Sequence, residues 1–167
     1  MGDDDAGIST VTDPSLFRTA MSRLGAAVNL VTTNGPSGRY GIVASAVCSV
    51  TDSPPTLLVC VNRSSGANAA IKSNGVLCVN ILSGRHQDIA TQFQSPRPDA
   101  RFDMGEWVEL QTRSPVLADA AAALDCTVVS IQEVGSHSVF FAEATALRVN
   151  DAIDGLIWFD RRHHHLT

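Results

Sequence analysis

The chain contains no run of about 18 apolar residues, the length that a helix needs to cross a membrane, so no membrane-spanning helix is expected. Charge is also scarce, because 17% of the 167 residues are Asp, Glu, Lys or Arg, and the net charge is -5. Binding to nucleic acid requires a basic stripe, which this acidic chain lacks. The composition therefore argues against both a membrane protein and a nucleic-acid-binding protein.

Several cofactor-binding and catalytic motifs are missing as well. No Gly-x-Gly-x-x-Gly follows a strand-like run, so a nicotinamide cofactor would not be held by a Rossmann unit. The glycine-bearing turn at 34–38 has no Walker lysine and opens no helix, which excludes a P-loop. The absence of a Gly-x-Ser-x-Gly elbow excludes the corresponding class of Ser/His/Asp hydrolase.

Cysteine is rare, and the thiols are not arranged as metal ligands or as a redox pair. None belongs to a Cys-x-x-Cys motif, and none has a histidine at zinc-ligand spacing. Because all of them lie in or beside apolar runs, we expect buried, reduced thiols, which suit a cytoplasmic protein. Adjacent histidines at 163–165 make a poor site for a single metal ion, so no metal is assigned. The cysteines are Cys48, Cys60, Cys78 and Cys126.

The N-terminal segment is acidic and is followed by no apolar run, so it is not typical of a secretory signal peptide. We expect residues 1–12 to form a disordered leader. A hydrophobic content of 44% and the absence of internal repeats indicate one globular domain over residues 13–167.

Many short strand-like runs separated by turns, with few helices, predict a mainly β fold of the barrel type. A helix should begin at Asp13-Pro14, end at Gly25 and pack its apolar stripe on a sheet. The segment 115–120 is ambiguous, because its alanines favour a helix, and we expect a short helical or irregular stretch. Residues 94–103 read as a surface loop. Strands are expected at 28–33, 40–50, 57–61, 76–82, 127–133, 139–149 and 156–159, and further helices at 67–74 and 83–93.

The stretch from Tyr40 to Ile71 contains the most informative pattern. Two β-rich segments flank a Ser-Pro-Pro corner at 53–55, where proline must stop a strand. The first carries small residues over 43–46, and the second, 57–61, is continuously apolar, as in a strand buried on both sides. The second runs into Asn-Arg-Ser-Ser-Gly and then a short helix, where unpaired N–H groups and Arg63 could seat a phosphate. The alternative is that Ser65 only caps a surface helix while Arg63 is a solvated charge.

The order and spacing of several motifs resemble the short-chain flavin reductases, the reductase components of two-component flavin monooxygenases such as those acting on 4-hydroxyphenylacetate or in pyrimidine breakdown. This resemblance implies a split β-barrel with a few peripheral helices, usually a homodimer with flavin near the subunit interface. It rests on residues 41–50, 54–65, 77–82, 101–102, 125–126, 135–137 and 155–162, and covers the chain from about Phe17 onward.

The resemblance also implies a set of flavin contacts. Small side chains would let backbone amides approach a flat ring, although a tightly packed barrel strand would have the same composition. Ring contacts are expected from Val43, Ala44, Ser45, Ala46 and Val47. Contacts with the ribityl phosphate are expected from Asn62, Arg63 and Ser65, and further contacts from Ala67, Asn68 and Phe93.

Three more residues are candidates from the C-terminal half. His137 follows a Gly-Ser turn and, by the resemblance, would orient the nicotinamide or steady the reduced flavin, although a lone hairpin histidine is more often a surface residue. The family commonly has an acidic residue at the position of Ser136, which removes an expected charge partner. Trp158 could wall the ring pocket and Arg161 could meet a pyrophosphate; alternatively, they are a core tryptophan and a solvated arginine.

The resemblance implies an NAD(P)H:flavin oxidoreductase that reduces FMN or FAD by direct hydride transfer, with NADH preferred to NADPH. Such an enzyme needs no protein nucleophile, because the protein supplies positioning and excludes water. A separate oxygenase would receive the reduced flavin. The alternatives are a flavin-bound reductase of another acceptor such as a cobalt corrinoid, a non-catalytic flavin- or haem-binding split barrel, and an enzyme like pyridoxamine-phosphate oxidase.

Overall fold

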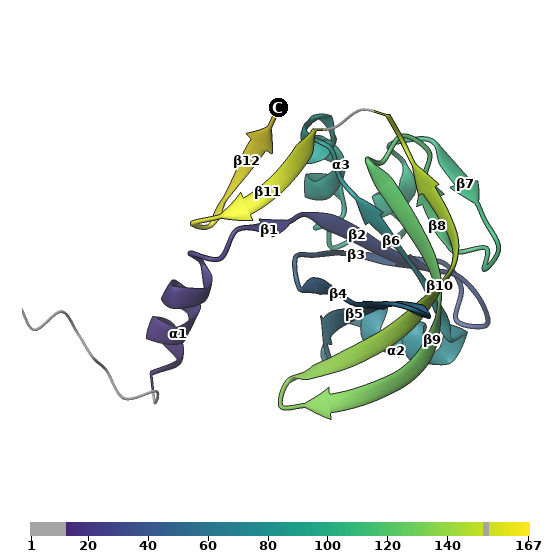
Figure 1. Ribbon diagram of the computed structural model, residues 1–167, viewed down its shortest axis with the longest axis horizontal. Helices are drawn as coiled ribbons and strands as arrows, with labels where there is room; N and C mark the ends of the chain where they lie inside the picture. The colour runs from purple at the N-terminus through teal and green to yellow at the C-terminus, as the bar shows by residue number, and fades with distance from the viewer. Residues whose placement is uncertain (1–12, 152–153) are drawn as a thin grey trace, which may run out of the picture.

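The computed structural model describes residues 13–151 and 154–167, so the predicted leader at 1–12 lies outside the described residues. Antiparallel sheets dominate these ranges, and helices lie at their margins (Figure 1), which confirms a mainly β fold with a few peripheral helices. No helix within them is long and apolar enough to cross a membrane.

The elements follow one another along the chain with short connections. The strands are β1 (Ala26–Ala27), β2 (Asn29–Thr33), β3 (Tyr40–Ala44), β4 (Val47–Asp52), β5 (Pro55–Asn62), β6 (Val76–Ile81), β7 (Trp107–Glu109), β8 (Pro115–Leu117), β9 (Ala122–Val134), β10 (His137–Val149), β11 (Gly155–Phe159) and β12 (Arg162–Leu166). The helices are α1 (Pro14–Met21), α2 (Gly66–Asn74) and α3 (Gln87–Gln92), with 3-10 turns η1 (Gly84–His86) and η2 (Asp99–Phe102).

The largest sheet has the strand order β3-β2-β6-β9-β10-β5-β4. Its edge strands β3 and β4 are consecutive in the chain, joined only by Ser45 and Ala46. The carbonyl of Ala46 accepts a hydrogen bond from the Cys60 amide at 3.0 Å, and β3 also contacts β5. The sheet therefore curls until its edges approach each other. The prediction of one continuous strand through 43–46 was wrong, because the chain leaves the first edge after Ala44.

Strand β5 alternates between buried and half-buried positions. Leu57, Val59 and Val61 are buried, whereas Leu58 and Cys60 are half-buried. The prediction that this strand is buried on both sides was therefore wrong, because only one face meets the core inside the curled sheet, whereas the other face, with Leu58 and Cys60, is partly exposed.

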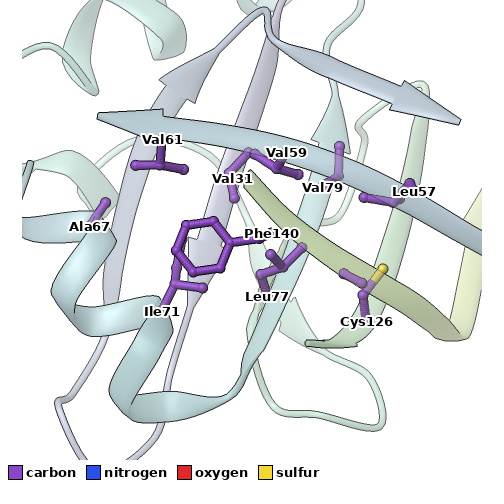
Figure 2. Packing of buried hydrophobic residues seen from close by; sticks show 11 residues of the cluster. Val31, Leu57, Val59, Val61, Ala67, Ile71, Leu77, Val79, Cys126 and Phe140 are labelled. Atoms are coloured by element: carbon purple, nitrogen blue, oxygen red, sulfur yellow. The ribbon is translucent and has the colours of Figure 1, made fainter. Parts of the chain in front are cut away.

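The main core lies between this sheet and α2. Figure 2 shows Phe140 of β10 beside Ile71 of α2 and Leu77 of β6, each fully buried. Burying side chains of this size contributes about 1.5–3 kcal/mol each. The core thus fixes α2 against the sheet, with its N-terminus after the end of β5.

Helix α2 has the ends that its sequence predicts. The Ser65 hydroxyl accepts a hydrogen bond from the Ala67 amide, and Gly75 takes a left-handed φ of 70° after the last turn. Glycine adopts this conformation without the steric cost that other residues meet. The predicted helix over 67–74 and the strand that follows it, β6, are confirmed.

A second core cluster supports the other end of the sheet. Phe93, which follows α3, packs edge-on against Phe102 with ring centroids 5.1 Å apart, and both contact Trp107. The predicted surface loop 94–103 is therefore only partly exposed, since η2 buries Ala100 and Phe102.

The segment from Pro115 to Ala120 differs from its predicted form. Residues 115–117 form strand β8, which pairs with β7 and is completely buried. The Leu117 amide donates to Asn80 Oδ1 at 2.7 Å, and the Pro115 carbonyl accepts from the Thr32 hydroxyl. These contacts come from distant parts of the sequence and outweigh the local helix propensity of the alanines.

The chain also forms a strand, β12, where the sequence predicts only a basic tail. Asp160 and Arg161 have φ values of 47° and 61°, and they form the two-residue connection that pairs β12 with β11. Such connections match the twist of a hairpin.

Helix α1 begins at Asp13-Pro14 as predicted, but it ends at Met21 instead of Gly25. None of its residues is buried: Phe17 within the helix is 57% exposed, and Leu24, which follows the helix, is 61% exposed. In Figure 1, α1 stands apart from the main sheet. The prediction that its apolar stripe packs on a sheet was therefore wrong.

The thiols are all free, as predicted, but not all are buried. Cys78 and Cys126 are buried, Cys60 is half-buried, and Cys48 is exposed on edge strand β4. The prediction of burial fails at Cys48, which lies on a strand whose residues from Cys48 to Asp52 are all exposed.

Candidate functional site

The Ser45–Ala46 link borders a hollow of about 250 Å³ between the two edges of the curled sheet. Residues from β3, β5 and β10 meet there, although they are far apart in the sequence. Among the predicted flavin contacts, this hollow is lined by Val43, Ala44, Ser45, Ala46, Asn62 and His137.

Strand pairing explains why these residues meet. His137 opens β10 directly opposite Asn62, the last residue of β5, in the antiparallel register. The Ala46 carbonyl is held by the Cys60 amide on the same strand β5. Residues 43–46 and the end of β5 therefore lie side by side, as the predicted flavin site requires.

His137 has a neutral partner. The Ser136 hydroxyl lies 2.9 Å from His137 Nδ1, and it can donate to or accept from the ring according to the tautomer. The ring therefore has no carboxylate partner at this contact, in agreement with the departure from the family pattern at position 136. Its position at the rim of the hollow suits hydrogen bonding to a ligand.

The Asn62 side chain shapes the turn that leads into α2. Its Oδ1 accepts from both the amide and the hydroxyl of Ser64, at 2.9 and 2.8 Å. Ser65 then caps the helix: its hydroxyl accepts from the Ala67 amide and its carbonyl accepts from the Asn68 amide. The first amides of α2 are therefore bonded within the turn, and the positive end of the helix dipole lies near the end of β5.

Arg63 lies beside this turn with 55% of its side chain exposed. Its Nε is 3.4 Å from Glu133 Oε2, and its Nη1 donates to the Gly135 carbonyl at 3.3 Å. Glu133 also accepts from Lys72, and this hydrogen bond, together with those from Ser138, holds the pKa of the Glu133 carboxyl below its usual value. Arg63, the cation predicted to contact the ribityl phosphate, is thus already paired with a carboxylate.

Three predicted contacts are interior residues. The side chains of Ala67, Asn68 and Phe93 are at most 3% exposed. Asn68 Nδ2 donates to the Val61 carbonyl and to the Ser138 hydroxyl, at 3.1 and 2.9 Å. These residues support the walls of the site from behind.

Val47 is separated from its neighbours in the sequence. It lies beyond the Ser45–Ala46 link and lines a different, mainly apolar hollow beside Leu57 and Leu124. The structure therefore divides the predicted ring contacts, 43–47, between two separate hollows.

Trp158 and Arg161 border two further hollows that share Ser45 with the first. One, of about 250 Å³, is lined by Trp158, Gln94 and His163 beside Ser45. The other, of about 350 Å³, includes Arg161 and several residues of α1. Arg161 Nη2 donates to Thr19 Oγ1 at 3.1 Å. Ser45 is therefore the point at which the three hollows meet.

Several lining residues were not selected from the sequence. Ile42, Cys60 and Val61 border the first hollow, and burial raises the pKa of the Cys60 thiol, which keeps it neutral. Strand alternation could have indicated Cys60, since it faces away from the core. Gln94 and His163 lie next to Trp158 only because of loop and hairpin packing, for which the sequence carries no clear signal.

Comparison with known proteins is consistent with this geometry. Residues 21–167 match the family model described as flavin reductase like domain. The FMN reductase (NADH) RutF of Variovorax paradoxus is 51% identical over 163 residues, covering 97% of this chain and 91% of that protein. The corresponding RutF protein of Pantoea ananatis is 52% identical, covering 90% of this chain and 80% of its own.

Solved structures show the same fold. The crystal structure of an inferred flavin reductase from Haemophilus somnus has a TM-score of 0.89 and 39% identity, covering 93% of this chain and all of that one. The flavin reductase component of a bacterial two-component tryptophan halogenase has a TM-score of 0.85 and 25% identity, with coverages of 92% and 98%. These similarities confirm the predicted split-barrel fold. The chain belongs to the family of proteins with a flavin reductase like domain.

Proposed function

We propose that this protein uses NADH to reduce FMN and releases the reduced flavin to a separate oxygenase. The observation that carries the proposal is the hollow at Ser45–Ala46. There the small residues at the end of β3, the end of β5 and His137 meet beside the N-terminus of α2. Its relatives at about 50% identity are named as NADH-dependent FMN reductases, which supports this choice of flavin and nicotinamide.

The residues of the hollow suit a flat, partly polar ring system. Ala44 and Ala46 leave room for a ring to approach the backbone, and Val43 supplies apolar contact. The positive end of the α2 dipole, with Arg63, provides the positive potential that a phosphate requires. FAD carries the same ring and first phosphate, so the same residues would serve either flavin.

Flavin, when bound, accepts a hydride directly from a nicotinamide ring stacked against it, so catalysis depends on positioning. Ser45 borders both the first hollow and the one at Trp158 and His163, so the two hollows adjoin, which suits two rings that meet beside this residue. His137 would donate a hydrogen bond to a ligand at the rim, with its ring oriented by Ser136.

A homodimer is the proposed assembly, with the apolar face of α1 in its interface. The side chains of Leu16, Phe17 and Met21 are 46%, 57% and 47% exposed. Exposed apolar side chains gathered on one helix mark a surface that binds another protein. Light scattering coupled to size exclusion is expected to give twice the chain mass. A monomer at micromolar concentration would contradict this assembly.

The proposed reaction is tested by mixing purified protein with NADH and FMN and following the loss of the NADH absorbance band. Turnover that requires added FMN, and in which reduced flavin leaves the protein, is expected. Tight flavin binding without NADH oxidation would favour a non-catalytic flavin-binding barrel, and no oxidation with either flavin and either nicotinamide would refute the proposal.

A further inference from the structure

A compact cluster of charged groups joins the turn of the β9–β10 hairpin to α2. Glu133 Oε1 is 2.6 Å from Lys72 Nζ, and its Oε2 is 3.4 Å from Arg63 Nε. The hydroxyl of Ser138, the residue paired with Glu133 in the hairpin, donates to the same carboxylate at 2.9 and 3.1 Å. The carboxylate is therefore held in place by three groups.

The cluster is tied to α2 and to the hairpin from both sides. Asn68, buried in α2, donates to the Ser138 hydroxyl at 2.9 Å. The Arg63 amide donates to the Ser136 carbonyl at 2.9 Å, and its guanidinium donates to the Gly135 carbonyl. Arg63 thus lies against the hairpin turn, with Glu133 as its one carboxylate partner in the part of the chain that the structure describes.

We propose that Glu133 is a positioning residue that competes with the flavin phosphate for Arg63 and so favours release of the flavin. This inference rests on the proposed function, in which Arg63 contacts that phosphate. A phosphate monoester carries a charge of about -1.5 to -2 at neutral pH and is repelled by a nearby carboxylate. Arg63 must give up or share its Glu133 contact before it can bind the phosphate fully.

This competition suits an enzyme that must hand its flavin to another protein. A guanidinium with no carboxylate partner would hold phosphate more tightly and would slow release. Because both Arg63 and Glu133 are about half exposed, with side-chain values of 55% and 44%, water screens their interaction and the effect is modest. We expect a fold-change of about three to ten in affinity when the Glu133 charge is removed.

The test compares Glu133→Gln with wild type in binding FMN and riboflavin, which lacks the phosphate. Glutamine keeps the shape of the side chain and can still accept from Ser138. The expected result is that FMN binds about three- to tenfold more tightly and dissociates more slowly, while riboflavin affinity is unchanged. Glu133→Asp, which keeps the charge, should restore wild-type behaviour in part.

Asp119→Asn is the matched control, because Asp119 is 53% exposed and pairs with Arg85 at 3.3 Å, so the same charge is removed from a different ion pair. If both variants bound FMN more tightly by the same factor, the effect would come from the net charge of the protein and not from Glu133, and the inference would be overturned. Unchanged or weaker FMN binding by Glu133→Gln, in a wild type that does bind FMN and oxidise NADH, would overturn it while leaving the proposed function intact. A wild-type protein that binds no flavin would refute both this inference and the proposed function.

Discussion

Replacing Arg63 with alanine should weaken FMN binding without affecting riboflavin. A charge-assisted hydrogen bond to phosphate contributes about 1.5–3 kcal/mol. The exposed pair of Arg63 with Glu133, which is regained when phosphate leaves, offsets up to about 1 kcal/mol of this. With the full offset, the expected net loss is about 0.5–2 kcal/mol, which corresponds to an increase of about 2- to 30-fold in the Kd of FMN.

The assay is equilibrium titration of each flavin, followed by the change in flavin fluorescence. Arg85→Ala is a suitable control, since Arg85 is 51% exposed and forms an ion pair of 3.3 Å with Asp119. It should leave FMN affinity unchanged. Arg63→Lys keeps a charge but loses the planar donor pair, so it should give an intermediate Kd.

Two results would refute this reasoning about Arg63. An unchanged Kd for FMN would mean that the phosphate lies elsewhere. An equal loss for FMN and riboflavin would mean that Arg63 acts by holding the hairpin turn through Gly135 and Ser136, instead of by contacting phosphate.

Three other predictions concern stability and reactivity. In Gly41→Ala the new Cβ would lie 2.5 Å from Phe93 Cε1, so urea unfolding should report a loss of about 1–3 kcal/mol, and an unchanged midpoint would contradict the packing described. A thiol reagent at pH 8 should label Cys48 rapidly but Cys126 only after unfolding, because burial raises the Cys126 pKa to about 12 and Cys48 is exposed; equal rates would be inconsistent with this burial. Because the pKa of Glu133 is lower in the folded protein than its unfolded value near 4.5, the ionised carboxylate stabilises the fold above pH 4.5, and this stabilisation is lost as the pH falls through the folded-state pKa. Glu133→Gln should therefore make the free energy of unfolding less dependent on pH in the acid range. Parallel pH curves for the variant and the wild type would contradict this.

Local signals in the sequence were sufficient for elements with well-defined ends. Ser65 and Gly75 predict both ends of α2, and the apolar run after Gly75 predicts β6. The proline corner at 53–55 correctly separates β4 from β5. In each case a residue with a restricted or unusual backbone preference marks the boundary.

The errors occur where contacts between distant residues decide the structure. Pro115 and Leu117 form a strand because Thr32 and Asn80 bond to their backbone, which no local pattern reveals. The break between β3 and β4 at Ser45 also has no signal in the local sequence, because the small residues around it fit a continuous strand. Only the curvature of the sheet places β3 and β4 on opposite edges.

The candidate site could be predicted only in part for the same reason. The resemblance to flavin reductases selects Asn62 and His137, and strand register brings them together. It does not indicate that Arg63 is paired with Glu133, because that contact depends on a hairpin turn about seventy residues further along the chain. Nor does it separate Val47 from Ser45, which lie on different sides of the strand break.

The most direct test of the proposed flavin site is a crystal structure with FMN bound. The expected result is a flavin ring against residues 43–46, with its phosphate at the N-terminus of α2 within hydrogen-bond distance of Ser65 or Arg63. A ring that lies away from the Ser45 link, or a phosphate far from Asn62 and Arg63, would contradict it.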